Sequence, residues 1–281
     1  MKIVSNRRSQ VLAARIATAM QAPLIDVRWT LFPDGEIYLQ AQETADSVAI
    51  IGSLLESDDL IELLLLTDVY READITLVIP YMGYARQDKV FKPGEALSAR
   101  AIARTLGAGV ARIITINLHE ETILPYFGVP AKDYTLAQAI SEYIKKLPCN
   151  NPLILGPDIG AARLSREIAQ AGNWESDHLQ KNRISGEEVR IEPKSIPVAG
   201  RVVVIVDDII STGGTQATAT KMLYDQGATE IYTVCVHGVL ASGAYSRLIS
   251  AGIKIVCCSD TIEQACSEYS AARTIADAIR R

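Results

Sequence analysis

The sequence predicts an α/β fold with two similar domains, each a mostly parallel sheet flanked by helices. Short runs rich in Val and Ile alternate with stretches of helical period, and this alternation occurs in both halves of the chain. Of the 281 residues, 48% are apolar, which is enough to bury two cores.

The first half begins with a strand directly after Met1 and continues with β and α elements in turn. Strands are expected at 47–54, 75–81 and 112–119, because these segments are short, apolar and β-branched. Helices are expected at 58–73 and 95–106, where apolar residues recur with helical spacing. This order is typical of parallel βαβ units.

The second half repeats the order, with strands expected at 151–157, 201–208 and 230–238 and helices at 161–172 and 215–227. Segments 106–120 and 226–240 share a helix-ending Gly-Ala, a strand and a histidine just past it. Duplication of one domain explains the match. Glycine also ends helices in unrelated α/β proteins, so the alternative remains open.

The domains are expected to divide at residue 133. Segment 129–135, VPAKDYT, places proline and polar residues between the two patterns, which gives domains at 1–133 and 134–281. The last helical segment, 270–281, could pack back on the first domain. Since the chain has no long Pro, Gly or Ser linker, the domains should pack closely.

Composition bounds the class of protein. A net charge of −5 argues against a nucleic-acid binder, which normally carries a basic surface. The sequence contains no run of 18 apolar residues and no apolar leader segment, so neither a membrane protein nor a secreted protein is expected. The cysteines, which are odd in number and lack C-x-x-C spacing, suggest reduced thiols of a cytoplasmic protein: Cys149, Cys235, Cys257, Cys258 and Cys266.

Residues 202–215, VVVIVDDIISTGGT, predict an anion site. A buried strand leads into a small-residue loop, and a helix opens at about Thr215, where free backbone N–H groups and the helix dipole favour phosphate. Glycines allow close approach, and hydroxyls add donors. The cradle residues are Ser211, Thr212, Gly213, Gly214 and Thr215. The lysine of a Walker A loop is absent.

Asp207 and Asp208 stand directly before this anion site. Carboxylates accept hydrogen bonds, so they suit the vicinal hydroxyls of a sugar or the water shell of a metal ion. A sugar phosphate satisfies both halves of the motif. The stretch DDIISTGGT resembles the phosphoribosyl-diphosphate motif of type I phosphoribosyltransferases, which implies acids on the ribose 2- and 3-hydroxyls and the loop on its 5-phosphate.

Five further segments, in order, resemble the ribose-phosphate diphosphokinase family, and its archaeal branch most closely: LFPDGEIYLQ, PYMGYARQDKVFKPGEALSARA, ITINLHEETILPYFGVP, GPDIGAARLS and LQKNRISGEEVRI. The resemblance covers nearly the whole chain. It implies two phosphoribosyltransferase-type domains, with ATP on the first and ribose 5-phosphate on the second. It further implies that the β,γ-diphosphoryl group moves to the sugar 1-hydroxyl and that AMP leaves.

The resemblance assigns ATP contacts to two segments of the first domain. At FPDGE, turn residues present acceptors, and the family places this loop in the ATP site of a neighbouring subunit, which implies a homo-oligomer. The alternative is that FPDGE forms only a β-turn and has no role in binding. At YARQD, Arg86 and Asp88 could instead form a surface ion pair worth about 0–1 kcal/mol. The implied ATP-binding residues are Phe32, Asp34, Gly35, Glu36, Arg86, Gln87 and Asp88.

Magnesium, as two ions, is implied with His119 and Asp158 as ligands. Histidine is an unusual ligand for this hard cation, so Asp158 is the firmer assignment. Many family members have Asp where Asn117 stands, which weakens a metal role there. His237, at the equivalent strand end of the second half, is interpreted as structural. The loop of Asp158, Ile159, Gly160 and Ala161 is expected to line the diphosphate region.

Lys181 and Arg183 lie in a polar stretch that predicts a loop or edge hairpin. Two nearby cations usually indicate only a solvated surface. The family, however, carries a K-x-R pair here on a flexible catalytic loop, and the resemblance also implies that Arg183 lies near ribose 5-phosphate. Transfer of a diphosphoryl group spreads negative charge that positioned cations stabilise. A loop that closes would exclude water.

Two competing functions are considered. A salvage phosphoribosyltransferase would share segment 202–215 but would not need FPDGE, YARQD or a second domain. A non-catalytic regulatory subunit would carry an insertion in 179–191, which is short here and retains both cations. Weak or absent allosteric inhibition is also expected, and a strongly sigmoidal ADP inhibition curve would contradict it.

Overall fold

The computed structural model describes residues 1–183, 189–193 and 197–281, and for residues 181–183 and 189–193 it describes the backbone alone. The chain forms two compact units. Unit 1 consists of residues 1–135, 261–263 and 270–281, and unit 2 of residues 136–260 and 264–269. The described part of the chain contains no helix that is long and apolar enough to cross a membrane.

Unit 1 is built on a five-stranded parallel sheet of order β1-β4-β5-β6-β7. Its sheet strands are β1 (Lys2–Ser5), β4 (Ser47–Ile51), β5 (Asp74–Ile79), β6 (Arg112–Ile116) and β7 (Ala131–Tyr134). Its helices are α1 (Gln10–Met20), α2 (Ser57–Val69), α3 (Ser98–Leu106), the 3-10 helix η1 (Glu121–Phe127) and α8 (Ala272–Ile279).

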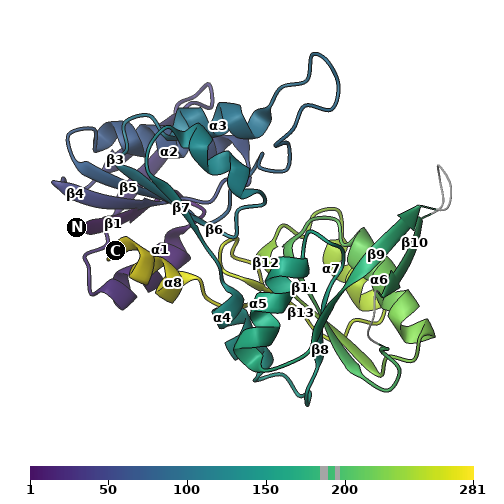
Figure 1. The fold of residues 1–281 in the computed structure, drawn as a ribbon. Coiled ribbons are helices and arrows are strands. Elements are labelled where there is room, and N and C mark those ends of the chain that lie inside the picture. Colours follow the sequence, from purple (N-terminus) through teal and green to yellow (C-terminus); the bar gives the residue numbers. More distant parts are fainter. Residues whose placement is uncertain (184–188, 194–196) are drawn as a thin grey trace. The chain divides into compact units, whose positions relative to one another are not determined.

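Helices cover both faces of this sheet, with α2 and α3 on one side and α1 and α8 on the other (Figure 1). Successive side chains of a strand point to opposite faces. Val48 and Ile50 therefore join the core that includes Leu63 of α2, whereas Ala49 and Ile51 are buried on the other face. Each aliphatic side chain buried in this way stabilises the fold by about 1.5–3 kcal/mol.

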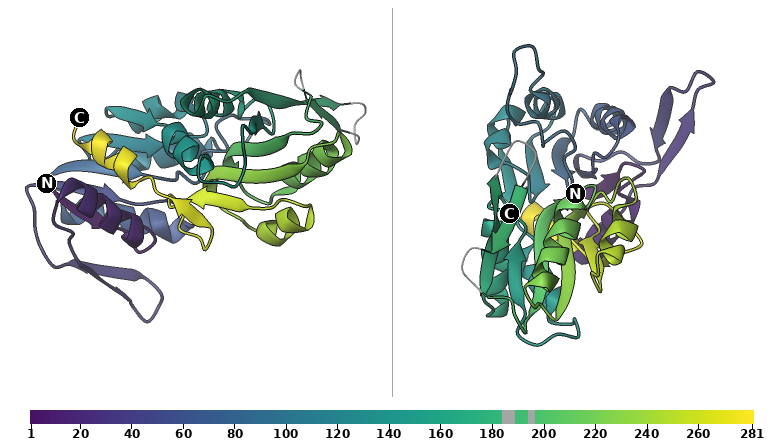
Figure 2. Two further views of the ribbon diagram at one scale, coloured as in Figure 1. Left: turned by 90° about the horizontal axis from the view of Figure 1, so that it is seen from below. Right: turned by 90° about the vertical axis from the view of Figure 1, so that its right-hand side faces the viewer.

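The C-terminal helix α8 packs against α1 and the strands β6 and β7 (Figure 2). Two arginines fasten it: Arg112 donates to the carbonyl of Ile279 at 2.5 Å, and Arg280 donates to the carbonyl of Ala19 at 2.7 Å. The end of the chain thus belongs to unit 1.

A two-stranded antiparallel hairpin of β2 (Val27–Leu31) and β3 (Ile37–Ala41) extends from unit 1 (Figure 2). Leu31, Phe32 and Tyr38 leave large apolar surfaces exposed near its tip. Val27 and Ala41 at its base, and Trp29 and Leu39 at its middle, pack on the core. The hairpin is therefore anchored at one end and open at the other.

Unit 2 is built on a seven-stranded sheet of order β10-β9-β8-β11-β12-β13-β14, parallel except for the edge pair of β10 and β9 (Figure 1). Its strands are β8 (Leu153–Gly156), β9 (Ser176–Arg183), β10 (Val189–Pro193), β11 (Val202–Ile210), β12 (Glu230–Gly238), β13 (Val256–Ser259) and β14 (Ser267–Tyr269). Its helices are α4 (Ala137–Ile144), α5 (Ala162–Gly172), α6 (Gly214–Asp225) and α7 (Ala244–Ser250).

The fold confirms the α/β prediction for both halves, and three boundaries are worth noting. Strand β11 continues through Asp207 and Asp208 to Ile210, because it pairs with β12 up to Gly238. Segment 129–135, expected as a connection, contributes β7 to the sheet of unit 1. Residues 179–183 and 189–191 lie in the antiparallel strands β9 and β10, as the edge-hairpin alternative predicted.

Candidate functional site

The carboxyl ends of the neighbouring strands β8 and β11 bring three aspartates together in unit 2. Asp158 follows β8 by two residues, and Asp207 and Asp208 lie near the end of β11, which pairs directly with β8. Open α/β sheets bind their ligands at this edge. The sheet order thus assembles residues that lie about fifty positions apart in the chain.

Asp207 is held firmly by two donors. Its Oδ2 accepts a hydrogen bond from Nε2 of Gln216 at 2.6 Å, and its Oδ1 accepts one from the backbone N–H of Asp208 at 3.0 Å. Burial raises the pKa of the Asp207 carboxyl well above its ordinary value, and the carboxylates of Asp208 and Asp158 raise it further. The site therefore concentrates negative charge that a cation or a hydroxyl donor would relieve.

Gln216 was not singled out by the sequence. It lies in the first turn of α6 and is 4% exposed. A buried amide requires partners, but its burial is a property of the folded chain, so the sequence offered no signal for this residue. It positions the carboxylate that the motif presents.

Replacing Asp207 by asparagine is expected to stabilise the ligand-free protein progressively as the pH rises above about 4. The folded-state pKa of Asp207 lies above its unfolded value of 3.8. Between these two pKa values the unfolded state ionises more readily than the folded state, so the folded protein loses stability as the pH rises. Asparagine cannot ionise, and its amide can still pair with Gln216. Melting temperatures of both proteins between pH 4 and pH 8 measure the difference.

The matched control for this experiment is Asp225→Asn, a change at an exposed position of the same unit, at the end of α6. It should shift the melting temperature equally at every pH. A stability gain of Asp207→Asn that stays constant with pH would contradict the raised pKa.

The loop of residues 211–213 leads into α6 and exposes the helix N-terminus. Gly213 is the N-cap residue with φ +71°, and a Cβ there would lie 3.1 Å from Cγ of Leu248. Gly214 is the first helical residue, and a Cβ there would meet no described heavy atom within 4 Å. Gly213 is thus required by the backbone, whereas the space over Gly214 is open to a ligand.

The Asp158 loop precedes α5 and is closed by its own aspartate. Oδ1 of Asp158 accepts hydrogen bonds from the N–H groups of Gly160 at 2.9 Å and Ala161 at 3.4 Å. A Cβ at Gly160 would lie 3.1 Å from that oxygen, so the turn leaves little room for a larger residue. Ile159 at its tip is 74% exposed.

In unit 1, residues 32–36 form the tip of the β2–β3 hairpin. The N–H of Phe32 donates to the carbonyl of Glu36 at 2.8 Å, and the N–H of Glu36 donates to Oδ1 of Asp34 at 3.3 Å. Gly35 has φ +93°, and the rings of Phe32 and Tyr38 meet edge to face at 5.8 Å. The predicted turn is confirmed, and it presents Phe32 to solvent.

Residues 86–88 follow β5 and carry an unsatisfied acceptor. Oδ2 of Asp88 is buried and meets no hydrogen-bond partner within the described residues. The nearby cation is Lys89, whose Nζ lies 3.5 Å away, while the Arg86 side chain is exposed. Among the described residues Asp88 pairs with Lys89, and the structure does not show the Arg86–Asp88 ion pair of the alternative. Oε1 of Gln87 accepts from the hydroxyl of Ser98 at 3.3 Å.

The end of β6 carries Asn117 and His119 on a tight turn. Asn117 has φ +42°, a conformation that asparagine tolerates. Asp133, which the sequence did not single out, fixes this turn: its Oδ1 accepts from the Thr115 hydroxyl at 2.6 Å and from the N–H of Leu118 at 3.0 Å. His119 is exposed, whereas His237 is only 2% exposed, in keeping with a structural role.

Several predicted residues lie outside what the structure describes. The backbones of Lys181 and Arg183 pair with Ile191 and Val189 in the edge hairpin, but their side chains are not among the described ones. Among the described residues, no group of three or more His, Cys, Asp or Glu is arranged to hold a metal ion. The five cysteines are all free thiols.

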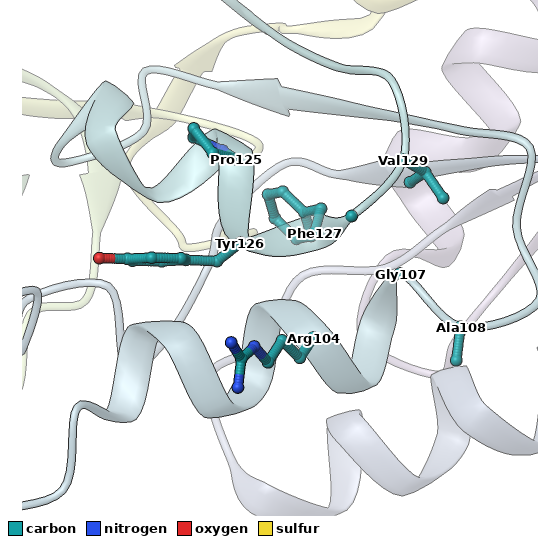
Figure 3. Close-up of a pocket in the computed structure, with 8 residues that line it drawn as sticks. Arg104, Gly107, Ala108, Pro125, Tyr126, Phe127 and Val129 are labelled. Atoms are coloured by element: carbon teal, nitrogen blue, oxygen red, sulfur yellow. The ribbon is translucent and has the colours of Figure 1, made fainter.

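An open hollow of about 420 Å³ lies between α3 and η1 in unit 1. Arg104 of α3 lies beneath Tyr126 of η1 at this hollow (Figure 3). Its other lining residues include Phe127 and Val129, and none of the predicted site residues contributes to it. The hollow is thus separate from the residues that the motifs identify.

Comparison with known proteins covers the whole chain. A sequence model of the N-terminal domain of ribose phosphate pyrophosphokinase matches residues 1–109, and one of the phosphoribosyl transferase domain matches residues 133–272. The chain is 45% identical to the ribose-phosphate pyrophosphokinase of Methanosarcina acetivorans, with 100% of both chains covered. It is 42% identical to that of Halobacterium salinarum, over 99% of this chain and 100% of the relative.

The fold also matches a solved structure. Phosphoribosylpyrophosphate synthetase from Mycobacterium smegmatis superposes with a TM-score of 0.85 at 25% sequence identity, over 99% of this chain and 97% of that one.

Proposed function

The chain belongs to the ribose-phosphate pyrophosphokinase family, and from this premise we propose which of its residues carry out each part of the reaction. The chain transfers the β,γ-diphosphoryl group of ATP to the 1-hydroxyl of ribose 5-phosphate. The products are 5-phospho-α-D-ribose 1-diphosphate and AMP, and the reaction serves nucleotide biosynthesis.

Ribose 5-phosphate is assigned to the carboxyl edge of β8 and β11. The observation that carries this assignment is a half-buried carboxylate pair, Asp207 and Asp208, directly ahead of an open helix N-terminus. The acids accept hydrogen bonds from the ribose 2- and 3-hydroxyls. The loop 211–215 donates to the 5-phosphate, and residues 158–161 line the diphosphate region.

ATP is assigned to two segments of unit 1. The hairpin tip 32–36 offers an exposed ring and carboxylates, which suit an adenine face and a ribose or amino donor. Segment 86–88 offers the Arg86 guanidinium for phosphates. Oδ2 of Asp88 lies 3.5 Å from Nζ of Lys89 but makes no hydrogen bond within the described residues, so it can accept one from a ligand here.

Lys181 and Arg183 are assigned to catalysis. The sugar 1-hydroxyl oxygen attacks the β-phosphorus of ATP and releases its proton to solvent. The bond between the β-phosphorus and the α,β-bridging oxygen breaks, and AMP leaves with that oxygen. Negative charge spreads over the transferring oxygens, and two positioned cations stabilise it.

Magnesium is the proposed cofactor, as two ions. Asp158 offers the hard oxygen ligand that Mg²⁺ prefers, and the charge of Asp207 and Asp208 on the neighbouring strand would attract a divalent cation. The exposed imidazole of His119 fits less well. When bound, Mg²⁺ would neutralise phosphate charge and hold the phosphates in place.

The function is tested by incubating purified protein with ATP, Mg²⁺ and ribose 5-phosphate and measuring products by chromatography. AMP and the sugar diphosphate should form in equal amounts without any added nucleobase, and omission of Mg²⁺ should stop the reaction. A salvage phosphoribosyltransferase would need a base, and a regulatory subunit would form no AMP. Either result would overturn the assignment.

We also propose that the ATP site is completed by the hairpin tip of a neighbouring subunit. The exposed apolar surface of Leu31, Phe32 and Tyr38 supports a contact of this kind. Asp34→Ala and Lys181→Ala proteins should each be inactive alone, because each disables every site. Co-expressed, they should regain activity, because hybrid oligomers contain sites that carry neither lesion.

The control for complementation co-expresses Asp34→Ala with Glu36→Ala, both on the same hairpin. Every shared site then carries one lesion, so activity should stay low. If the Asp34→Ala and Lys181→Ala hybrids form, as native mass spectrometry can check, and remain inactive, each subunit has an independent site.

A cytoplasmic location is the remaining proposal, and five free thiols support it, because thiols persist in a reducing compartment. Recovery of the protein in an oxidising compartment after cell fractionation would contradict it.

A further inference from the structure

Three successive carbonyls of the segment leading into α6 are held by one neighbouring segment. The carbonyl of Ile210 accepts from the N–H of Leu240 at 3.0 Å, and that of Ser211 accepts from the N–H of Ala241 at 2.9 Å. The carbonyl of Thr212 accepts from Nη1 of Arg247. The first two donors are backbone groups, and only the third is a side chain.

These three hydrogen bonds also fix the direction of the N–H groups in the same three peptide units. In a trans peptide, the C=O of one residue and the N–H of the next point in opposite directions. The N–H groups of Ser211, Thr212 and Gly213 therefore point away from residues 240–247. Successive N–H groups turned outward at a helix start form an anion-binding concavity.

Arg247 is itself held in place. Its Nη2 donates to the carbonyl of Ser242 at 3.1 Å, so the guanidinium lies between two carbonyls. Ser242 and Gly243 have φ of +54° and +72°, which turns the chain sharply before α7. Leu248, which directly follows Arg247 in α7, packs under Gly213. Adjacent residues of α7 thus hold the loop by a charge-assisted bond and by packing.

We infer that Arg247 is a positioning residue that holds the Thr212–Gly213 peptide in the orientation that binds the 5-phosphate of ribose 5-phosphate. The inference rests on the proposed phosphate site at residues 211–215. Arg247 contacts the loop through the Thr212 carbonyl, so it acts through the backbone.

The guanidinium is suited to this role for two reasons. Charge-assisted hydrogen bonds are roughly twice as strong as neutral ones, and a cation on the carbonyl polarises the peptide, which makes the Gly213 N–H a better donor. A planar fork can also serve two carbonyls at once, whereas the ammonium of lysine is a single point charge. Lysine should therefore replace Arg247 only in part.

The test compares steady-state kinetics of Arg247→Ala and wild-type protein. The KM for ribose 5-phosphate should rise about tenfold, which corresponds to loss of one charge-assisted hydrogen bond. The KM for ATP should change less than about twofold, and millimolar ethylguanidinium should restore part of the affinity. Arg247→Lys should lie between the two proteins and remains informative if Arg247→Ala does not fold.

The control is Arg71→Ala in unit 1, an exposed arginine whose Nη1 also donates to a carbonyl, that of Asp68 at 3.3 Å. It should leave both KM values unchanged. An unchanged KM for ribose 5-phosphate in Arg247→Ala would overturn the inference. So would an equal rise in both KM values without rescue by ethylguanidinium, since that pattern indicates a general loss of structure.

A valine at Gly214 separates this inference from the proposed site. If Gly214→Val raises the KM for ribose 5-phosphate and Arg247→Ala does not, the phosphate site stands and Arg247 is irrelevant to it. If Gly214→Val has no effect, the phosphate site is wrong, and the role of Arg247 falls with it.

Discussion

Lys181→Ala is expected to lower kcat by about 10²–10³-fold, the range found when one preorganised donor to a transition-state charge is removed. Negative charge spreads over the transferring oxygens in the transition state, so a lysine positioned for that arrangement matters more there than in the ground state. The KM for ribose 5-phosphate should change little, and ATP binding should remain largely intact. Single-turnover formation of AMP together with equilibrium ATP binding measures both quantities.

Lys254→Ala is the matched control, because Lys254 is an exposed lysine of the same unit, between α7 and β13. Its kcat should equal that of the wild type. If Lys181→Ala retains near-normal turnover, Lys181 has no catalytic role, and Arg183 becomes the first residue to examine.

Gly214→Val is expected to raise the KM for ribose 5-phosphate about 100-fold while leaving the melting temperature within about 1–2 °C of the wild type. Gly214 has no positive φ, and a Cβ there meets no described heavy atom within 4 Å, so the fold tolerates a side chain. The 5-phosphate could not bind in the same way, because the valine methyl groups would occupy its space. Losing two charge-assisted hydrogen bonds, about 3 kcal/mol in total, gives this magnitude.

The neighbouring glycine provides the contrast. Gly213 has φ +71° and lies against Leu248, so Gly213→Val should lower the melting temperature. Kinetics and thermal denaturation of both variants distinguish a ligand requirement from a backbone requirement. A Gly214→Val protein with an unchanged KM would show that the 5-phosphate binds elsewhere.

The strands and helices that the sequence predicted are present in the structure, because their signals lie within contiguous residues. The sequence did not predict α1, α4, α7 or the strands β2, β3, β13 and β14. The short β-branched run VVVIV before Asp207 favours a buried strand, and Gly213-Gly214 before TQATAT indicates a helix start. The motif for a phosphoribosyl ligand is equally local. All its parts lie within fourteen residues, so no knowledge of the topology was needed to recognise it.

The supporting residues could not be recognised in this way. Gln216 is identified only by its bond to Asp207, and Asp133 only by its bonds across the β6–β7 pair. Arg247 lies 35 residues beyond Thr212 and has an unremarkable sequence context. Which side chain meets which carbonyl depends on strand order and helix rotation, and a periodic pattern does not specify either.

By itself, the sequence determined the α/β class of both halves, the parallel strands and the chemistry of the ligand, because each depends on short-range periodicity and on residue type. Only the tertiary structure decided that β11 continues through the aspartates, that α8 packs in unit 1, and that burial beside Asp208 and Asp158 raises the pKa of Asp207. The reason is physical: burial and electrostatic coupling are properties of the assembled sheet edge, where residues distant in the chain share one low-dielectric environment.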